Sequence, residues 1–117
     1  MTFTIQGELP SLNKYINTER TNRFAAASMK KKATEKVMLS IKDRTQLQHI
    51  IIDIWYYCKN KRTDKDNIAF AKKFIFDGLQ KAGVIENDGW DNIIYWREYF
   101  LLDKTNPRIV VEIKEER

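Results

Sequence analysis

Along this chain, hydrophobic and polar residues follow the two-residue period of a strand in some segments and the period of a helix in others. From Thr2 to Leu9 the pattern alternates, with Phe3 and Ile5 on one face, which predicts a half-buried strand. The segment Gln48–Lys59 is instead rich in β-branched and aromatic residues, which predicts a central strand that is apolar on both faces. Asp53 is the one acidic residue of this strand, and we expect it to lie near an edge or to pair locally rather than to bind a metal.

The C-terminal part of the chain predicts two more strands. Residues Asn92–Leu102 are dense in isoleucine and aromatic side chains, and the residues after Pro107 alternate between apolar and polar positions. The polar run Asp103–Asn106 between them predicts a turn. Because this turn is short, we expect the two strands to form a hairpin.

Two segments show the helical period. In Ala25–Asp43 a small or apolar residue recurs every four positions, at Met29, Ala33, Val37 and Ile41. A second helix is expected to begin at Asp64 or Asp66, either of which can cap it, and to end at Gly83. The polar segment Leu12–Phe24 has little periodicity, which predicts a surface loop.

The predicted element order is therefore β-α-β-α-β-β. This order describes an α+β protein with a small mixed sheet and two helices, and a length of 117 residues predicts a single domain over residues 1–117. With 43% hydrophobic residues, a chain of this length can build a core without disulfides or structural metals.

The charge and the cysteine content of the chain limit which binding partners and which cellular compartments are expected for it. Basic residues outnumber acidic ones by 21 to 16, a net charge of +5, which is compatible with nucleic-acid binding but common in other proteins. The one cysteine, Cys58, excludes an internal disulfide and a cysteine-rich zinc site, so we expect a reduced, cytoplasmic setting. The longest apolar stretch, Ile50–Cys58, is too short to span a bilayer, and the N-terminus lacks a signal-peptide pattern, so no membrane partner is expected.

Basic residues that can contact a polyanion gather in two segments. They are Lys59, Lys61 and Arg62 directly after the central strand, and Lys14, Arg20 and Arg23 in the earlier polar segment. Tyr15 lies among the earlier group and is a candidate for stacking on a base or sugar. The alternative for the earlier segment is a solvated loop with one packed tyrosine.

Three acidic residues are candidate ligands for a divalent metal. Asp64 and Asp66 follow the central strand, one residue apart, and Asp88 follows the second predicted helix. Carboxylate oxygens are the ligands that magnesium prefers, and a bound magnesium ion can activate water for phosphodiester hydrolysis. Because a helix of about 16 residues is roughly 24 Å long, Asp88 joins the pair only if the chain doubles over or if a partner chain supplies it. The alternative for Asp64 and Asp66 is helix capping.

Helical phase points to a lysine beside these acids. In a continuous helix Asp66, Lys73 and Asp77 fall on one stripe, with Lys73 about 10 Å along the axis from Asp66. Its side chain can then lean toward a phosphate held near the acids. The alternative for Lys73 is a surface ion pair with Asp77, which contributes little to stability.

The residues singled out resemble those of the RusA family of Holliday-junction resolvases. The likeness spans nearly the whole chain, and its specific part is Arg62–Asp88. The matching segments there are Asp64-Lys65-Asp66-Asn67, Lys73, Asp77-Gly78-Leu79, Ala82-Gly83-Val84-Ile85 and Asn87-Asp88. The early motif Pro10-Ser11-x-Asn13-x-Tyr15 and the element order are similar to those of the family as well, which adds Asn13 to the candidate DNA-contacting residues.

The resemblance implies a small homodimeric endonuclease that recognises four-way DNA junctions by shape. Such an enzyme nicks two opposing strands with magnesium, or with manganese in its place. By the same resemblance, the metal ligands are Asp64, Asp66 and Asp88, and the catalytic lysine is Lys73. In the best-known members the lysine follows the D-x-D-N run more closely, where this chain has a phenylalanine, so Lys72 remains the alternative.

Two functions are therefore in competition. The first is a structure-specific endodeoxyribonuclease that resolves Holliday junctions and other branched DNA by paired magnesium-dependent nicks. The second is a non-catalytic basic DNA-binding module, whose acidic residues only cap helices and face solvent. The first requires a divalent metal for its activity, and the second does not.

Overall fold

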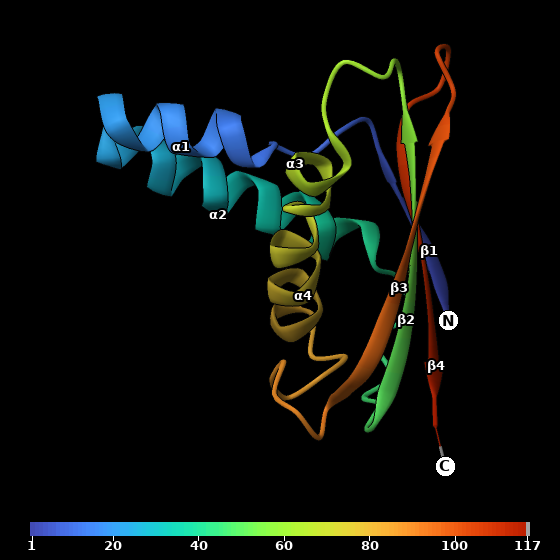
Figure 1. The fold of residues 1–117 in the computed structure, drawn as a ribbon. Coiled ribbons are helices and arrows are strands. Elements are labelled where there is room, and N and C mark those ends of the chain that lie inside the picture. The colour runs from blue at the N-terminus through green and yellow to red at the C-terminus, as the bar shows by residue number, and fades with distance from the viewer. Residues whose placement is uncertain (117) are drawn as a thin grey trace.

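The chain forms a four-stranded mixed sheet with all its helices on one face (Figure 1). This is a computed structural model, and it describes residues 1–116. The sheet order is β1-β4-β2-β3, with β1 at Thr2–Gln6, β2 at Ile50–Cys58, β3 at Ile93–Leu102 and β4 at Arg108–Glu115. β4 pairs antiparallel with both β1 and β2, whereas β2 and β3 are parallel. The α+β class, the mixed sheet and the interior position of β2 are therefore confirmed.

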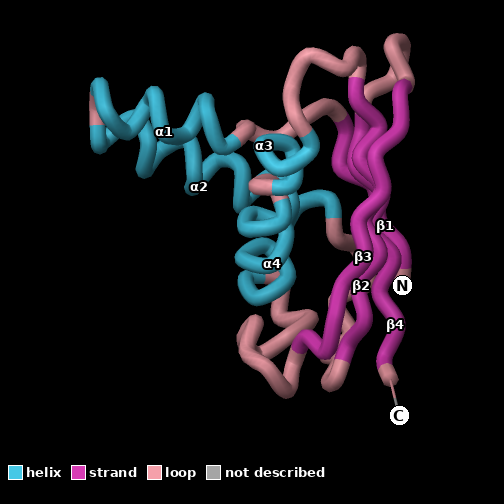
Figure 2. Tube along the Cα trace, in the orientation of Figure 1, coloured by secondary structure: helices cyan, strands magenta, loops and turns pink. Residues whose placement is uncertain are grey.

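The helices number four within the described residues, so the prediction of two was wrong. They are α1 at Leu12–Thr21, α2 at Arg23–Ser40, α3 at Lys65–Ala69 and α4 at Lys72–Lys81, and the element order is β-α-α-β-α-α-β-β (Figure 2). None of the helices in residues 1–116 is long and apolar enough to cross a membrane.

Helix α1 occupies the segment that was predicted to be a loop. The Ser11 hydroxyl caps its first turn by accepting the Lys14 N–H at 3.2 Å. Asn22 both ends α1 and caps α2, because its side chain accepts the N–H groups of Phe24 and Ala25. No residue of α1 is buried, and Figure 1 shows α1 and α2 projecting together away from the sheet. This helix therefore has only a short apolar stripe, none of it buried, and gives a weak signal in a periodicity analysis.

The second predicted helix is divided at Phe70 and Ala71. Around this point the N–H groups of Ala71, Lys73 and Phe74 bond to carbonyls three residues back, not four, which tightens the helical winding. The Phe70 ring packs on Tyr15 of α1 and on Phe74 of α4, with ring centroids 5.4 Å apart in both pairs. The stripe that joined Asp66 to Lys73 in a continuous helix is therefore wrong, because the phase changes between them.

Strands β3 and β4 do not form the predicted hairpin, because β2 lies between them. The turn that joins them crosses the end of β2, where the Asp103 N–H donates to the Cys58 carbonyl at 2.8 Å. β2 reaches its parallel neighbour β3 through α3 and α4, which serve as the crossover that a parallel pair requires. Strand pairing thus follows the burial of the apolar β2 rather than the length of the turn.

The core lies between the helices and one face of the sheet. Ile50, Ile52 and Ile54 of β2 are completely buried there, against α4 residues that include Phe74 and Leu79. Helix α4 ends as predicted at Gly83, whose φ of 78° allows the N–H groups of residues 83 and 84 to bond back to residues 80 and 79. These contacts hold α3 and α4 firmly over β2 and β3.

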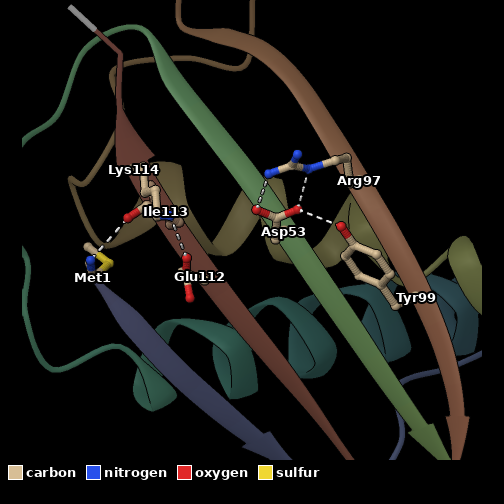
Figure 3. A network of polar contacts seen from close by, with 7 residues as sticks. All are labelled: Met1, Asp53, Arg97, Tyr99, Glu112, Ile113 and Lys114. Carbon is tan, nitrogen blue, oxygen red and sulfur yellow. Dashed lines mark hydrogen bonds and ion pairs between the residues drawn. The ribbon is translucent and has the colours of Figure 1, made fainter.

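Asp53 points to the other face of the sheet and pairs across to β3, as Figure 3 shows. Its two carboxylate oxygens accept hydrogen bonds from Arg97 at 2.7 and 2.9 Å, and the Tyr99 hydroxyl donates to it at 3.3 Å. The hydrogen bond from Arg97 holds the pKa of the Asp53 carboxyl below its usual value. The expectation of a local partner for Asp53 is confirmed.

Candidate functional site

A groove of about 920 Å³ lies between the segment that follows β2 and the last residues of β3. Asp64 and Asp66 both line it, one on each side of Lys65. Its other lining residues fall into a polar set on the loop and an apolar set on β2, α3 and β3: Asn60, Lys61 and Thr63, and Cys58, Ile68, Phe100, Leu101 and Leu102. The two carboxylates thus share one concave surface with two lysine ammonium groups.

The Asp64 carboxylate does not cap α3, whereas the Asp66 carboxylate accepts one of the free N–H groups in the first turn of this helix. Asp64 occupies the N-cap position of α3, yet its side chain accepts no capping hydrogen bond. Asp66 Oδ1 accepts two hydrogen bonds from the next residue, Asn67, one from its backbone N–H at 2.9 Å and one from its side-chain amide at 3.5 Å. Both side chains are exposed, and neither forms an ion pair within residues 1–116. Most of their oxygen lone pairs remain available to a ligand.

Asp88 lies in the loop between α4 and β3, and hydrogen bonds within this loop and to the start of β2 fix its conformation. The Asn87 side-chain oxygen accepts the Gly89 N–H at 2.8 Å and the Asn92 amide at 2.7 Å. The loop is fastened to the start of β2, since the Ile50 N–H donates to the Asn92 carbonyl at 2.8 Å. His49 adds a contact of 2.7 Å between its Nδ1 and the Asp91 carbonyl oxygen.

Asp88 and the Asp64/Asp66 pair therefore lie at opposite ends of β2. Figure 1 shows the loop before β3 at one end of the sheet and α3 at the other. β2 contains nine residues, which at about 3.3 Å each separate the two ends by roughly 26 Å. Across residues 1–116, no three metal-ligating side chains come together. The chain does not double over to gather the three acids, which leaves the alternative of a partner chain.

Lys72 is engaged with residues of β3. Its ammonium lies 3.0 Å from a carboxylate oxygen of Glu98 and 5.5 Å from the centre of the Trp96 ring. Glu98 also accepts hydrogen bonds from the Tyr56 hydroxyl at 2.9 Å and the Trp96 indole at 3.0 Å. Burial, aided by this carboxylate, raises the pKa of Tyr56 far above its usual value. Lys72 thus fastens the start of α4 to β3.

Lys73 is exposed and does not line the groove. The ion pair with Asp77, which was the alternative for Lys73, does not form in the described chain. Lys65 is the lysine that the sequence reasoning missed, although its place between the two acids was a usable signal. Its ammonium lies over the Phe100 ring, 5.7 Å from the ring centre, inside the groove.

A second hollow, of about 370 Å³, lies beside the same segment and shares Cys58, Asn60, Thr63 and Ile68 with the groove. Three basic residues line it, and two of them, Lys14 and Lys59, were predicted to contact phosphates. The third is Arg108, which the sequence reasoning missed. Its guanidinium lies 3.9 Å from the Tyr57 ring centre and is bound to Asp103 at 2.7 Å.

The other predicted DNA-contacting residues fall in different places. Lys61 and Arg62 are exposed in the segment after β2, and Asn13 is exposed in the first turn of α1. Arg20 and Arg23 are exposed where α1 ends and α2 begins, and Figure 1 shows this junction as the end of the two helices farthest from the sheet. Tyr15 packs on Phe70, as in the alternative of a packed tyrosine, and burial together with Glu19 raises the pKa of its hydroxyl.

Comparison with models of known protein families gives no match, and comparison with curated protein sequences gives none either.

Proposed function

We propose that this chain is a metal-dependent endodeoxyribonuclease that cuts branched DNA and acts as a RusA-like homodimer. The observation that carries the proposal is the pair Asp64 and Asp66, two exposed carboxylates without ion-pair partners in the described chain, on one groove next to Lys61 and Lys65. A phosphodiester of DNA fits this arrangement, because the lysines attract it and the carboxylates can share a cation with it.

The donor set fits magnesium or manganese. Asp64 and Asp66 offer carboxylate oxygens one residue apart, which are hard ligands suited to such ions. When bound, the ion would supply charge compensation at the phosphate and an activated water. Lys65 is better placed than Lys73 to stabilise negative charge on the phosphate, because it lines the groove.

The third ligand, Asp88, is proposed to come from the partner subunit. Its distance from the pair within one chain is the reason, together with its exposure in a loop that carries no basic residue between Glu86 and Asp91. A site shared in this way also places two cleavage centres in each homodimer, which paired nicks on opposing strands require.

DNA binding is proposed to follow the basic residues around the two hollows. The segment from Lys59 to Asp66 contains four basic and two acidic residues, a net charge of +2, and Lys14 and Arg108 lie next to it. Phosphate contacts of this kind make affinity fall steeply with salt. The second candidate, a non-catalytic DNA-binding module, is favoured by the absence of a complete three-acid cluster in residues 1–116.

A synthetic four-way junction separates these two candidates. The wild-type chain is expected to cut it with magnesium and to bind it without cutting in a chelator. Asp66→Asn should bind equally well and lose at least roughly a hundredfold in cutting rate, whereas Asp43→Asn, an exposed aspartate in the loop before β2, should cut normally. Undiminished cutting by Asp66→Asn removes this residue from the mechanism, and binding without cutting under every divalent ion favours the module.

Mixed dimers test whether the site is shared. Asp66→Asn and Asp88→Asn homodimers are each expected to be inactive. A heterodimer of the two variants, purified through different tags, keeps one intact site if Asp88 of the partner subunit completes it, and should therefore nick one strand per junction. A heterodimer without any nicking activity contradicts the shared site.

A further inference from the structure

Strand β3 is an edge strand with an apolar surface. It pairs with β2 on one side, and no strand of the described chain pairs with its other side. Of the nine large hydrophobic residues that are exposed within residues 1–116, six belong to β3: Ile94, Tyr95, Trp96, Tyr99, Leu101 and Leu102. Free backbone groups along such an edge are a template for pairing with another strand.

We propose that β3 pairs antiparallel with β3 of a second copy of this chain, and that Trp90 packs on the apolar lining of the partner's groove, apart from its acidic and basic residues. The two-fold axis stands perpendicular to the sheet, so the two sheets join into one and the helices of both protomers lie on the same face. This interface deepens the proposed function, because the same pairing brings Asp88 to Asp64 and Asp66 of the partner subunit. Its link to the shared metal site rests on the proposed function.

The antiparallel arrangement brings unlike ends of β3 together. The loop with Trp90 precedes β3, and the groove lies at the last residues of β3, so each loop meets the groove of the other protomer. Figure 1 shows this loop and α3 on the same side of the sheet. The loop and the groove therefore remain on a common face after the two-fold rotation.

Trp90 has the properties of an anchor residue. Its side chain is 96% exposed, the highest value among the exposed large hydrophobics, so its own chain gives it almost no contact. The groove offers Ile68, Phe100 and Leu102 as an apolar lining. A tryptophan that fills an apolar pocket is typical of the residues that dominate protein interfaces.

The charges of the two regions are complementary. The segment from Lys59 to Asp66 has a net charge of +2. The loop from Glu86 to Asp91 carries three acidic residues and no basic one. Apposition of these surfaces favours a head-to-tail contact of each loop with the partner's groove over contact of like ends.

Charge also restricts the register of the pairing. In a two-fold antiparallel pair one residue lies opposite its own copy, and like charges directly opposite each other are destabilising. This disfavours an axis at Arg97 or at Glu98, the two charged residues of β3. An axis at Trp96 or at Tyr99 instead places two aromatic rings opposite each other.

Sedimentation equilibrium of the full chain over a concentration series tests the proposal. The wild type is expected to be a dimer, and Trp90→Ser is expected to weaken it by at least roughly tenfold. Leu102→Lys, which places a charge on the edge strand, should weaken it as well. The matched controls are Phe24→Ser and Leu39→Lys, at side chains 83% and 72% exposed on α2, and both should remain as dimeric as the wild type.

Folding of each variant is checked by its far-UV circular dichroism. A monomeric wild type, or a folded Trp90→Ser variant with an unchanged dimer constant, overturns the proposal, and so does loss of the dimer in either control. A wild type that dimerises in this way but never cuts DNA leaves the interface standing and refutes the nuclease. A protein that cuts junctions while Trp90→Ser stays fully dimeric supports the nuclease and refutes this interface.

Discussion

Alanine at Gly78 is expected to destabilise the protein, although alanine is the better helix former. Gly78 lies in α4 where this helix meets α2, and a Cβ there would stand 2.5 Å from Val37 Cγ1 and 2.7 Å from Val37 Cβ. Val37 is completely buried and cannot rotate away. Replacing glycine by alanine gains about 1 kcal/mol of helix propensity, but overpacking costs about 1–3 kcal/mol. Because the overlap includes the rigid Cβ, we expect a net loss of about 1–2 kcal/mol.

A double-mutant cycle with Val37→Ala identifies the cause of this loss. Val37→Ala alone removes two buried methyl groups, a cost of about 2 kcal/mol. It also removes the closest of the clashing atoms, so the double variant should be more stable than the sum of the single effects by about 1 kcal/mol. The assay is urea unfolding followed by circular dichroism, with the free energy of unfolding taken at constant m-value.

Gly83→Ala is the matched control for the cycle. A Cβ at Gly83 meets no atom within 4 Å, and its cost comes from the positive φ of 78° alone. Its effect should therefore add to that of Val37→Ala within about 0.5 kcal/mol. If Gly78→Ala stabilises the protein, or if its cost is the same with and without Val37→Ala, the close approach of α2 and α4 is not what requires this glycine.

Two further predictions concern the carboxylates of Asp53, which is buried, and Glu98, which is partly buried. Asp53→Asn should lower the free energy of unfolding at pH 7 by about 1–2 kcal/mol, because it breaks the pair with the half-exposed Arg97. The pKa of Asp53 is lower in the folded state than in the unfolded state. This stabilisation is therefore complete above the unfolded pKa of about 4 and is lost as the pH falls through the lower folded pKa. The free energies of unfolding of wild type and variant should converge in acid, and a difference that stays constant with pH would refute the assignment. Glu98→Ala should lower the free energy of unfolding in urea by about 2–3 kcal/mol, because it leaves the Tyr56 hydroxyl and the Lys72 ammonium without a partner. Glu98→Gln keeps a hydrogen-bond acceptor and should lower it by less. Equal losses in the two variants would contradict the role of these hydrogen bonds.

The pattern of apolar residues predicted most of the regular elements. β1, β2, β4 and α2 lie where the periods placed them, because each buries one face or both faces against the core. β3 lies where its run of isoleucine and aromatic residues placed it, although most of its side chains are exposed. α1 was not predicted, because its side chains are at most half-buried. The sequence features that indicate it are the capping Ser11 and the spacing of Leu12, Tyr15 and Ile16. The division between α3 and α4 was not predicted, because the apolar stripe continues across Phe70 and Ala71. What changes there is the hydrogen bonding, which reaches carbonyls three residues back instead of four.

The candidate site was predicted in part. Asp64, Asp66 and Lys61 share a groove, which their closeness in the sequence made predictable. The position of Asp88 was not predictable, because it depends on the direction of β3 relative to β2. The prediction of Lys73 as the catalytic lysine relied in part on an unbroken helix, and the structure brings Lys65 rather than Lys73 into the groove.

The sequence by itself determined which segments are buried, where the chain changes direction, and which charged groups cluster after the central strand. Only the tertiary structure decided that β2 lies between β3 and β4, that Asp88 stands at the far end of β2, and that the apolar edge of β3 is left open. The reason is physical. A period along the chain reports how each residue is buried in its own element, whereas neighbours in a sheet are chosen by which arrangement buries all the elements at once.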